Sequence, residues 1–134
     1  MPLYARIEIG KVTQLMEASS PPFSMPPVFE YVDVTGNTEI KVGWNATYSY
    51  PLWVFTKPTD EQLRTEAQGR VVQTLNDAVR WLLLNPLQYK VDIGVASTAE
   101  EAQLLAYKQY CVSVSEVDKQ AGYPETINWP VAPW

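Results

Sequence analysis

The hydrophobic pattern of the chain changes its period near residue 57, and this change limits the fold more than any other feature. Apolar residues first alternate, with Leu3, Ala5 and Ile7 on one side of an extended strand. Further along they recur every three or four residues, which is the spacing of a helix with one buried face. The sequence therefore predicts an α+β protein in two parts: residues 1–56, a small antiparallel β module, and residues 57–134, an α-helical hairpin with an extended Pro/Trp-rich C-terminal tail.

The β module is expected to contain several short strands. Gly10-Lys11 should form the turn between the first strand and a second strand at Val12–Met16. The two Pro-Pro pairs in residues 18–27 predict a loop, because proline cannot donate a hydrogen bond to a sheet. Three further strands are predicted at residues 28–35, 40–44 and 46–55, the last of them at an edge or broken in two by Pro51.

The helical part shows clear start and stop signals. Residues 59–62 have the form of a capping box, and Asn85-Pro86 should end or kink the helix that follows. Residues 87–97 fit either a short strand or a frayed continuation of this helix. A second capping box, from Thr98 to Glu101, opens another helix, so the two helices are expected to form a hairpin.

Composition excludes most classes of function. Ten basic and fifteen acidic residues give a net charge of −5, which repels phosphate backbones and anionic lipids, so nucleic acid and membranes are poor partners. The chain has no histidine, the commonest general base and metal ligand, and its glycines form no phosphate-binding loop. Cys111 has no histidine to activate it and is expected in the core. We therefore expect no enzyme activity, catalytic residue, metal, cofactor or small-molecule substrate.

The location of the protein is also constrained. The N-terminus lacks the basic start and apolar run of a signal peptide, and the longest aliphatic block, residues 81–84, is too short to cross a bilayer. A single cysteine cannot form an internal disulfide, which agrees with a reducing compartment. The expectation is that the protein stays in the compartment where it is made.

Aromatic residues are denser than a small core requires, and they supply the candidate binding residues. Core packing is the simpler explanation for Trp44. Tyr48 and Tyr50 share a face of their strand, while Trp53 and Phe55 follow Pro51 on a probable edge, where rigid aromatic rings also suit binding hot spots. The predicted partner-binding residues are Trp44, Tyr48, Tyr50, Trp53, Phe55 and Trp134.

The C-terminal tail, from Tyr123 to Trp134, must cover an apolar surface, since a free tail rich in Trp and Pro would aggregate. That surface is either the helical hairpin of this chain or a partner. Docking on the hairpin is favoured for Ile127 and Trp129, and both alternatives stay open for Trp134.

The tail and several other segments resemble the tail fibre assembly proteins of tailed bacteriophages. In that family a leucine-rich helix with an aromatic-Lys-x-Tyr segment leads to a Val-Asp and a closing Trp-Pro. The matching segments are Leu104–Tyr110, Val117-Asp118 and Ile127–Pro130, with further similarity in Tyr4–Val12, Phe29–Thr35 and Val42–Trp44. The Asp-Gly turn expected near Asn45-Ala46 is missing, and Val131–Trp134 are additional.

The resemblance implies a chaperone that binds the C-terminal, receptor-binding tip of a trimeric tail fibre protein and assists its folding and trimerisation. It would act in the cytoplasm of the bacterial host, either leaving the fibre or staying on its tip in the virion, and it would come from a phage, a prophage or a phage-tail-like particle. The alternative is a virion component with a role in host-cell recognition, which binds surface glycans through exposed Trp and Tyr rings.

Overall fold

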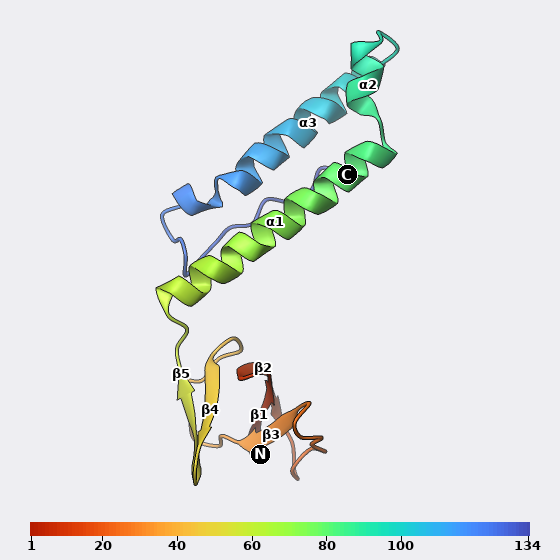
Figure 1. Cartoon of the computed structure of the whole chain (residues 1–134). Helices are drawn as coiled ribbons and strands as arrows, with labels where there is room; N and C mark the ends of the chain where they lie inside the picture. Colours follow the sequence, from red (N-terminus) through yellow and green to blue (C-terminus); the bar gives the residue numbers. More distant parts are fainter. The chain divides into compact units, whose positions relative to one another are not determined.

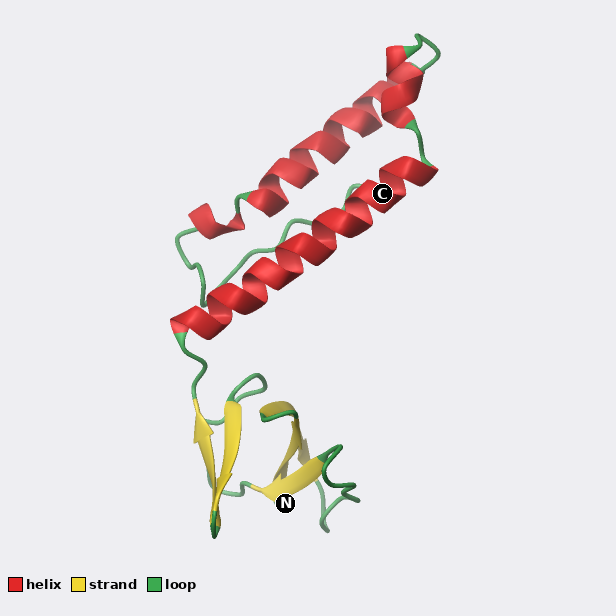
Figure 2. Cartoon of the chain, in the orientation of Figure 1, coloured by secondary structure: helices red, strands yellow, loops and turns green.

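The computed structural model describes residues 1–134 and divides into two compact units, Met1–Thr59 and Asp60–Trp134 (Figure 1). We call them the β unit and the helical unit. The first contains all the strands and the second all the helices (Figure 2). The predicted α+β class, with an N-terminal antiparallel β module followed by helices, is therefore confirmed.

The β unit is a single five-stranded sheet with the strand order β3-β1-β2-β4-β5. All neighbouring strands are antiparallel, and β3 and β5 form the two edges. Only one residue pair, Lys11 with Asn45, joins β2 to β4 in register. The strands are β1 Leu3–Glu8, β2 Lys11–Glu17, β3 Glu30–Asp33, β4 Asn45–Ser49 and β5 Leu52–Thr56.

One face of the sheet carries the core of the β unit. Register places Ile7 opposite Val12, and Ala5 opposite Val32, so the alternating apolar residues of three strands meet on this inner face. Ala46 joins them from β4. The buried cluster consists of Ala5, Ile7, Val12, Val34, Ile40 and Ala46.

The first hairpin turns one residue earlier than the sequence predicts. Ile9 and Gly10, not Gly10 and Lys11, separate β1 from β2, and both have positive φ angles, 49° and 70°. Two such residues make the turn whose twist matches that of the paired strands. A β-branched residue rarely adopts this conformation, so sequence rules favour glycine in the first position and misplace the turn.

The strand predicted at residues 40–44 is absent, and this expectation was wrong. Gly43 has a φ of 96°, and the N–H of Trp44 donates to the carbonyl of Lys41 at 3.1 Å, which closes a turn. The side chain of Asn37 accepts hydrogen bonds from the N–H groups of Glu39 and Ile40. These turns interrupt the strand, although Gly43 and Trp44 still form backbone hydrogen bonds with Val12 of β2 at 2.8 and 2.9 Å, and Ile40 is buried.

The helical unit contains α1 Asp60–Leu84, α2 Leu87–Asp92, α3 Thr98–Ser115 and a short 3₁₀ helix, η1, at Val117–Lys119. The first helix ends at Asn85-Pro86, as predicted, and the ambiguous segment after it forms a short helix. The capping box of α3 joins Ser97 to Glu100, one residue before the predicted pair. In this position Glu100 also pairs with Lys90 of α2. None of the helices is long and apolar enough to cross a bilayer.

Two apolar clusters hold α1 and α3 together. Ala78 of α1 packs with Leu104 and Tyr107 of α3 and with Leu87 of α2. The second cluster consists of Val71, Val114 and Val117, with Leu75, Ile127 and Trp129 packed against it. The small side chain of Ala78, which is fully buried, lets the helices approach closely.

Leu75→Asp should destabilise the helical unit by about 2–4 kcal/mol, because it places a carboxylate against an apolar cluster. Urea unfolding followed by far-UV circular dichroism measures the change. Val79→Asp is the matched control, since Val79 is one turn further along α1 and 63% exposed. Equal stability of the two variants would contradict this packing scheme.

The stability of the helical unit should fall between pH 10 and about 12. Burial, helped by a hydrogen bond with Cys111, raises the pKa of Tyr107 from 10.0 to about 12. Above pH 10 the unfolded chain therefore loses a proton that the folded chain still holds, and unfolding becomes easier until the folded pKa is reached. Tyr107→Phe should remove this component, as measured by urea unfolding at pH 8 to 11.5. Parallel pH profiles for the two proteins would contradict it.

Candidate partner-binding surface

Three of the predicted binding residues lie together on the hairpin formed by β4 and β5. The ring of Tyr48 is 5.4 Å from that of Trp53 and 6.5 Å from that of Tyr50, in tilted and edge-to-face arrangements. Tyr48 is directly opposite Trp53 in the ladder, which explains the first contact. Tyr50, at the tip of the hairpin, is 87% exposed. We call these three residues the aromatic cluster.

Trp44 and Phe55 have a different environment. Both are partly buried and pack against the apolar core of the β unit. Trp53 also contacts this core and so links the aromatic cluster to it. The structure thus brings Tyr48, Tyr50 and Trp53 together and gives Trp44 and Phe55 a packing role.

A hollow of about 460 Å³ opens on the inner face of the sheet beside the aromatic cluster. Tyr48, Trp53, Pro26 and Pro27 are among the residues that line it. Glu30 supplies a carboxylate. The remaining lining residues are Ile7, Ile9, Gly10, Ala46 and Thr47.

Ile9 is the residue at this surface that sequence reasoning missed. Its side chain is 98% exposed, and its φ of 49° is unfavourable for a β-branched residue. An isoleucine in this position contributes nothing to the core and strains the backbone, so a role at a binding surface would explain it. In the sequence, the dipeptide Ile9-Gly10 at the end of an alternating strand could have indicated that Ile9 lies in the turn.

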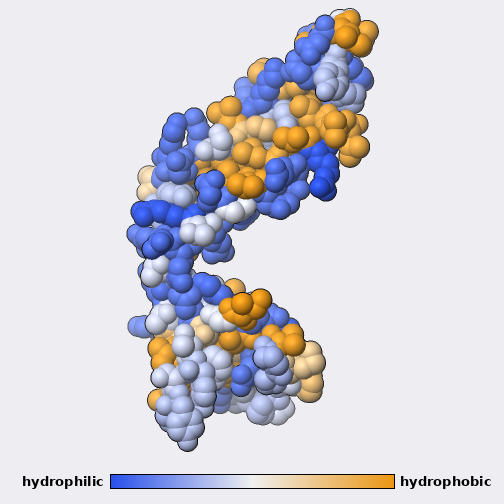
Figure 3. All heavy atoms as spheres, in the orientation of Figure 1, coloured by the Kyte–Doolittle hydropathy of each residue, from blue (hydrophilic) through white to orange (hydrophobic).

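The hairpin that carries the aromatic cluster has no charged residue between Asn45 and Thr56. Leu52 and Val54 on β5 are 69% and 46% exposed. Figure 3 draws the tip of this hairpin, at the bottom of the view, in pale colours rather than the strong blue of charged residues. The surface is therefore neutral, partly apolar and rich in rings.

A second ring cluster, also missed by sequence reasoning, lies on the opposite face of the sheet. Phe29 contacts Phe23 and Tyr31 edge to face, with ring centroids 6.2 and 6.1 Å apart. The guanidinium of Arg6 lies 4.3 Å from the centroid of Phe29, and it also pairs with Glu8 at 3.1 Å. Only Phe23, 76% exposed, presents most of its ring to solvent.

Trp134 belongs to the helical unit, whereas the other candidates belong to the β unit. Its indole stacks on Trp81 of α1, with centroids 4.5 Å apart and planes 11° from parallel, and meets Tyr110 of α3 edge to face at 5.3 Å. It remains 42% exposed. The ring therefore has a partner within its own chain, and its assignment to partner binding stays a prediction.

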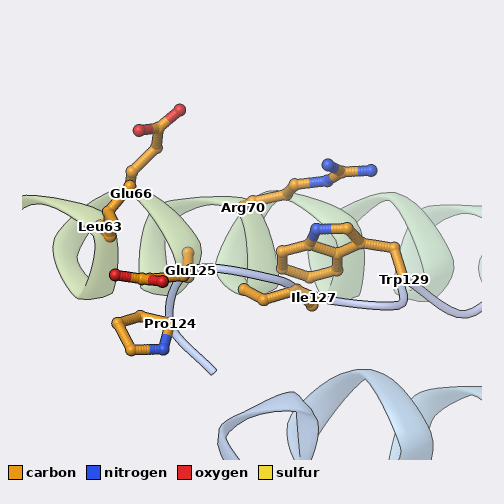
Figure 4. Close-up of a pocket in the computed structure, with 8 residues that line it drawn as sticks. Leu63, Glu66, Arg70, Pro124, Glu125, Ile127 and Trp129 are labelled. Carbon is orange, nitrogen blue, oxygen red and sulfur yellow. The ribbon is translucent and has the colours of Figure 1, made fainter. Parts of the chain in front are cut away.

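The preceding part of the tail borders a groove of about 350 Å³ along α1 (Figure 4). Figure 4 shows the indole of Trp129 and the guanidinium of Arg70 close together, and the distance from Arg70 Cζ to the ring centroid is 4.2 Å. Gln120 fastens the tail by accepting from the N–H of Asn128 and donating to its carbonyl. Ile127 and Trp129 thus pack on the helices of this chain.

Another apolar surface lies at the C-terminal end of α1. Val79, Leu82, Leu83, Pro86, Gln88 and Tyr89 line a hollow of about 260 Å³. Tyr89 is 65% exposed there. This surface is the main competitor to the aromatic cluster as a partner site.

Local contacts and burial explain the shifted pKa values of several titratable groups. Hydrogen bonds from the Thr35 side chain and backbone lower the pKa of Asp33 within a turn, and the contact with Lys90 lowers that of Glu100. Burial raises the pKa of Tyr110 beside α1. No group of three His, Cys, Asp or Glu residues could hold a metal ion.

Trp134→Ala should lower the free energy of unfolding by about 1–2 kcal/mol, because it removes three ring contacts. It should also remove the near-UV circular dichroism that arises from the stacked indoles of Trp81 and Trp134. Val131→Ala is the control, since Val131 is 88% exposed. Unchanged stability and an unchanged near-UV spectrum would show that Trp134 is not docked in solution.

Comparison with known proteins agrees with the resemblance seen in the sequence. The model of the family described as "Caudovirales tail fibre assembly protein, lambda gpK" matches residues 7–134. A protein of Acyrthosiphon pisum secondary endosymbiont phage 1, described as a probable tail fiber assembly protein, is 33% identical over 84 residues, which cover 62% of this chain and 52% of that protein.

The match thus spans about half the length of this curated relative. No solved structure is significantly similar to the chain. The family match, by contrast, covers nearly all of it, including both units and the C-terminal tail. The chain therefore belongs to the tail fibre assembly protein family of the tailed bacteriophages.

Proposed function

We propose that this protein is a chaperone that binds the C-terminal, receptor-binding region of a trimeric tail fibre and assists its folding and trimerisation. The aromatic cluster and the adjoining hollow of the β unit form the docking surface. The helical unit has its own core, and its C-terminal tail lies along it. The observation that carries this assignment is the exposed, uncharged aromatic surface around Tyr50.

The properties of this surface support the proposal. Tyrosine and tryptophan supply large contact areas at a small cost in side-chain entropy, and they dominate binding hot spots. Trp53 is held between the core and Tyr48, so its ring is already fixed before a partner arrives. The strained, exposed Ile9 borders the same hollow.

The partner has a physical need for such a surface. Interwoven fibre tips are rich in β-structure, and each chain exposes strand edges and apolar faces until three chains have met. A protein that covers those regions reversibly would suppress incorrect pairing. Binding alone performs this task, so we assign no catalytic step and no cofactor, and we place the activity in the cytoplasm of the bacterial host, with the fibre tip of the virion as a second location.

Co-expression with the C-terminal region of the cognate fibre tests the proposal, with soluble trimer measured by gel filtration. The wild-type chain should increase the yield of trimer, and Tyr50→Ala should weaken fibre binding roughly fivefold to thirtyfold because it removes a hot-spot ring. Phe23→Ala is the matched control, since this ring is also exposed but lies on the opposite face of the sheet. Equal yields of trimer with and without the chain would refute the proposal.

A second candidate function, glycan binding at the fibre tip, is favoured by one observation. The hollow combines the rings of Tyr48 and Trp53 with the carboxylate of Glu30, a combination that can hold a sugar by stacking and hydrogen bonding. Saturable binding of host-surface glycans by the isolated chain, lost in Trp53→Ala, together with unchanged fibre trimerisation, would select this function instead.

A further inference from the structure

The two edges of the sheet differ, and the difference indicates how a partner binds. The outward N–H of Tyr31 on edge strand β3 donates to the side chain of Ser24 at 2.9 Å, within the proline-rich loop. This strand has only four residues and carries an acidic residue, Glu30 and Asp33, at each end. Short length, charge and a covering loop are the usual means by which proteins close a sheet edge.

The opposite edge, β5, has none of these protections. It is a regular five-residue strand with the sequence Leu-Trp-Val-Phe-Thr, paired with β4 along its whole length without a bulge. It contains no charged residue and no proline, and no further strand of the sheet pairs with it. An apolar edge of this kind invites another strand to pair with it.

Hydrogen bonding in the sheet identifies the backbone groups that this edge offers. The N–H of Ala46 on β4 donates to the carbonyl of Gly10, next to β2, and so points away from β5. Phe55 is directly opposite Ala46, and in an antiparallel ladder such a pair exchanges no hydrogen bond between its own two strands. The N–H and C=O groups of Phe55, and of Trp53 two residues before it, therefore point outward.

We propose that β5 is the docking strand for the fibre: an extended, uncharged segment of the C-terminal region of the fibre pairs with Trp53 and Phe55 and adds a sixth strand to the sheet. This inference rests on the proposed function and specifies its binding mode. The neutral hairpin selects the occupant by charge, because a Lys or Asp side chain beside Leu52 or Val54 would lose water without gaining a partner. Alternate side chains of the incoming strand would lie beside Trp53 and the hollow.

This mode also explains how the complex can be reversible. Trp53 and Phe55 provide two backbone donors and two acceptors. A fibre strand would form more backbone hydrogen bonds than these when it is fully paired in its trimer. The completed trimer would therefore compete successfully for the strand. Until then, the chaperone would protect it from pairing with a wrong strand.

A lysine substitution in β5 tests whether this strand is the docking strand. Val54→Lys in the full chain should weaken binding to the C-terminal region of the fibre by at least about tenfold, because edge lysines block strand addition. Ser49→Lys is the matched control: Ser49 is exposed and lies on the inner strand of the pair, directly opposite Leu52, and it does not line the hollow. It should change the affinity less than about threefold.

Amide hydrogen exchange, measured by NMR on the complex, keeps the test independent of any folding defect in the variants. Exchange at Trp53 and Phe55 should slow by at least about tenfold on binding, since their outward N–H groups gain acceptors. Leu52 and Val54, whose N–H groups already face β4, should change little.

Each contrary outcome has a distinct meaning. Fibre binding that is unchanged in Val54→Lys, or lost equally in both lysine variants, would overturn the docking strand while leaving the proposed function intact. Slowing of exchange in the free protein as its concentration rises would show that a second copy occupies the edge instead. If the wild-type chain does not bind the fibre region, the proposed function fails as well.

Discussion

A β unit of about 60 residues cannot bury all of its apolar side chains, and the rest of the structure depends on this constraint. The inner face of the sheet buries small and branched residues such as Ala5, Ile7 and Val12. The β4–β5 hairpin joins this core through Ala46 and Phe55, while one residue pair holds it in register with β2. Its remaining rings and its outer edge stay exposed, without charged residues to keep partners away. A unit built in this way leaves apolar surface available for a partner instead of burying it in its own core.

In the helical unit, by contrast, the C-terminal tail of the chain covers part of the apolar surface. Ile127 and Trp129 lie against α1 and α3, and Trp134 stacks on Trp81. Arg70 extends over the exposed side of Trp129, so a charged residue shields the ring from water. The tail resembled the family most strongly in sequence, yet its rings are engaged within the chain. The aromatic cluster of the β unit has fewer internal contacts and is the stronger candidate for the partner.

Local sequence signals predicted the class of the fold and most of its elements, because period and turn residues act over a few positions. The change from alternating to helical spacing of the apolar residues was sufficient to predict the α+β class. Asn85-Pro86 marked the end of α1 correctly. Two of the errors concern the exact residues of a turn and of a helix cap. Ile9 accepts an unfavourable φ in the turn, and Glu100 replaces Glu101 in the capping box, where it also pairs with Lys90. The aromatic cluster could be predicted from strand spacing, whereas the stack of Trp134 on Trp81 joins residues 53 positions apart and has no local signature.

Photo-crosslinking would show whether the fibre contacts the β unit at its aromatic cluster. A photoreactive phenylalanine analogue would replace Tyr50 in one variant and Tyr89 in another, since both tyrosines are exposed but lie on the two competing surfaces. Each full-length variant would be co-expressed with the C-terminal region of the fibre and irradiated. We expect a covalent adduct with the fibre from position 50 and none from position 89. An adduct from position 89 alone would contradict this expectation and assign the fibre to the helical unit.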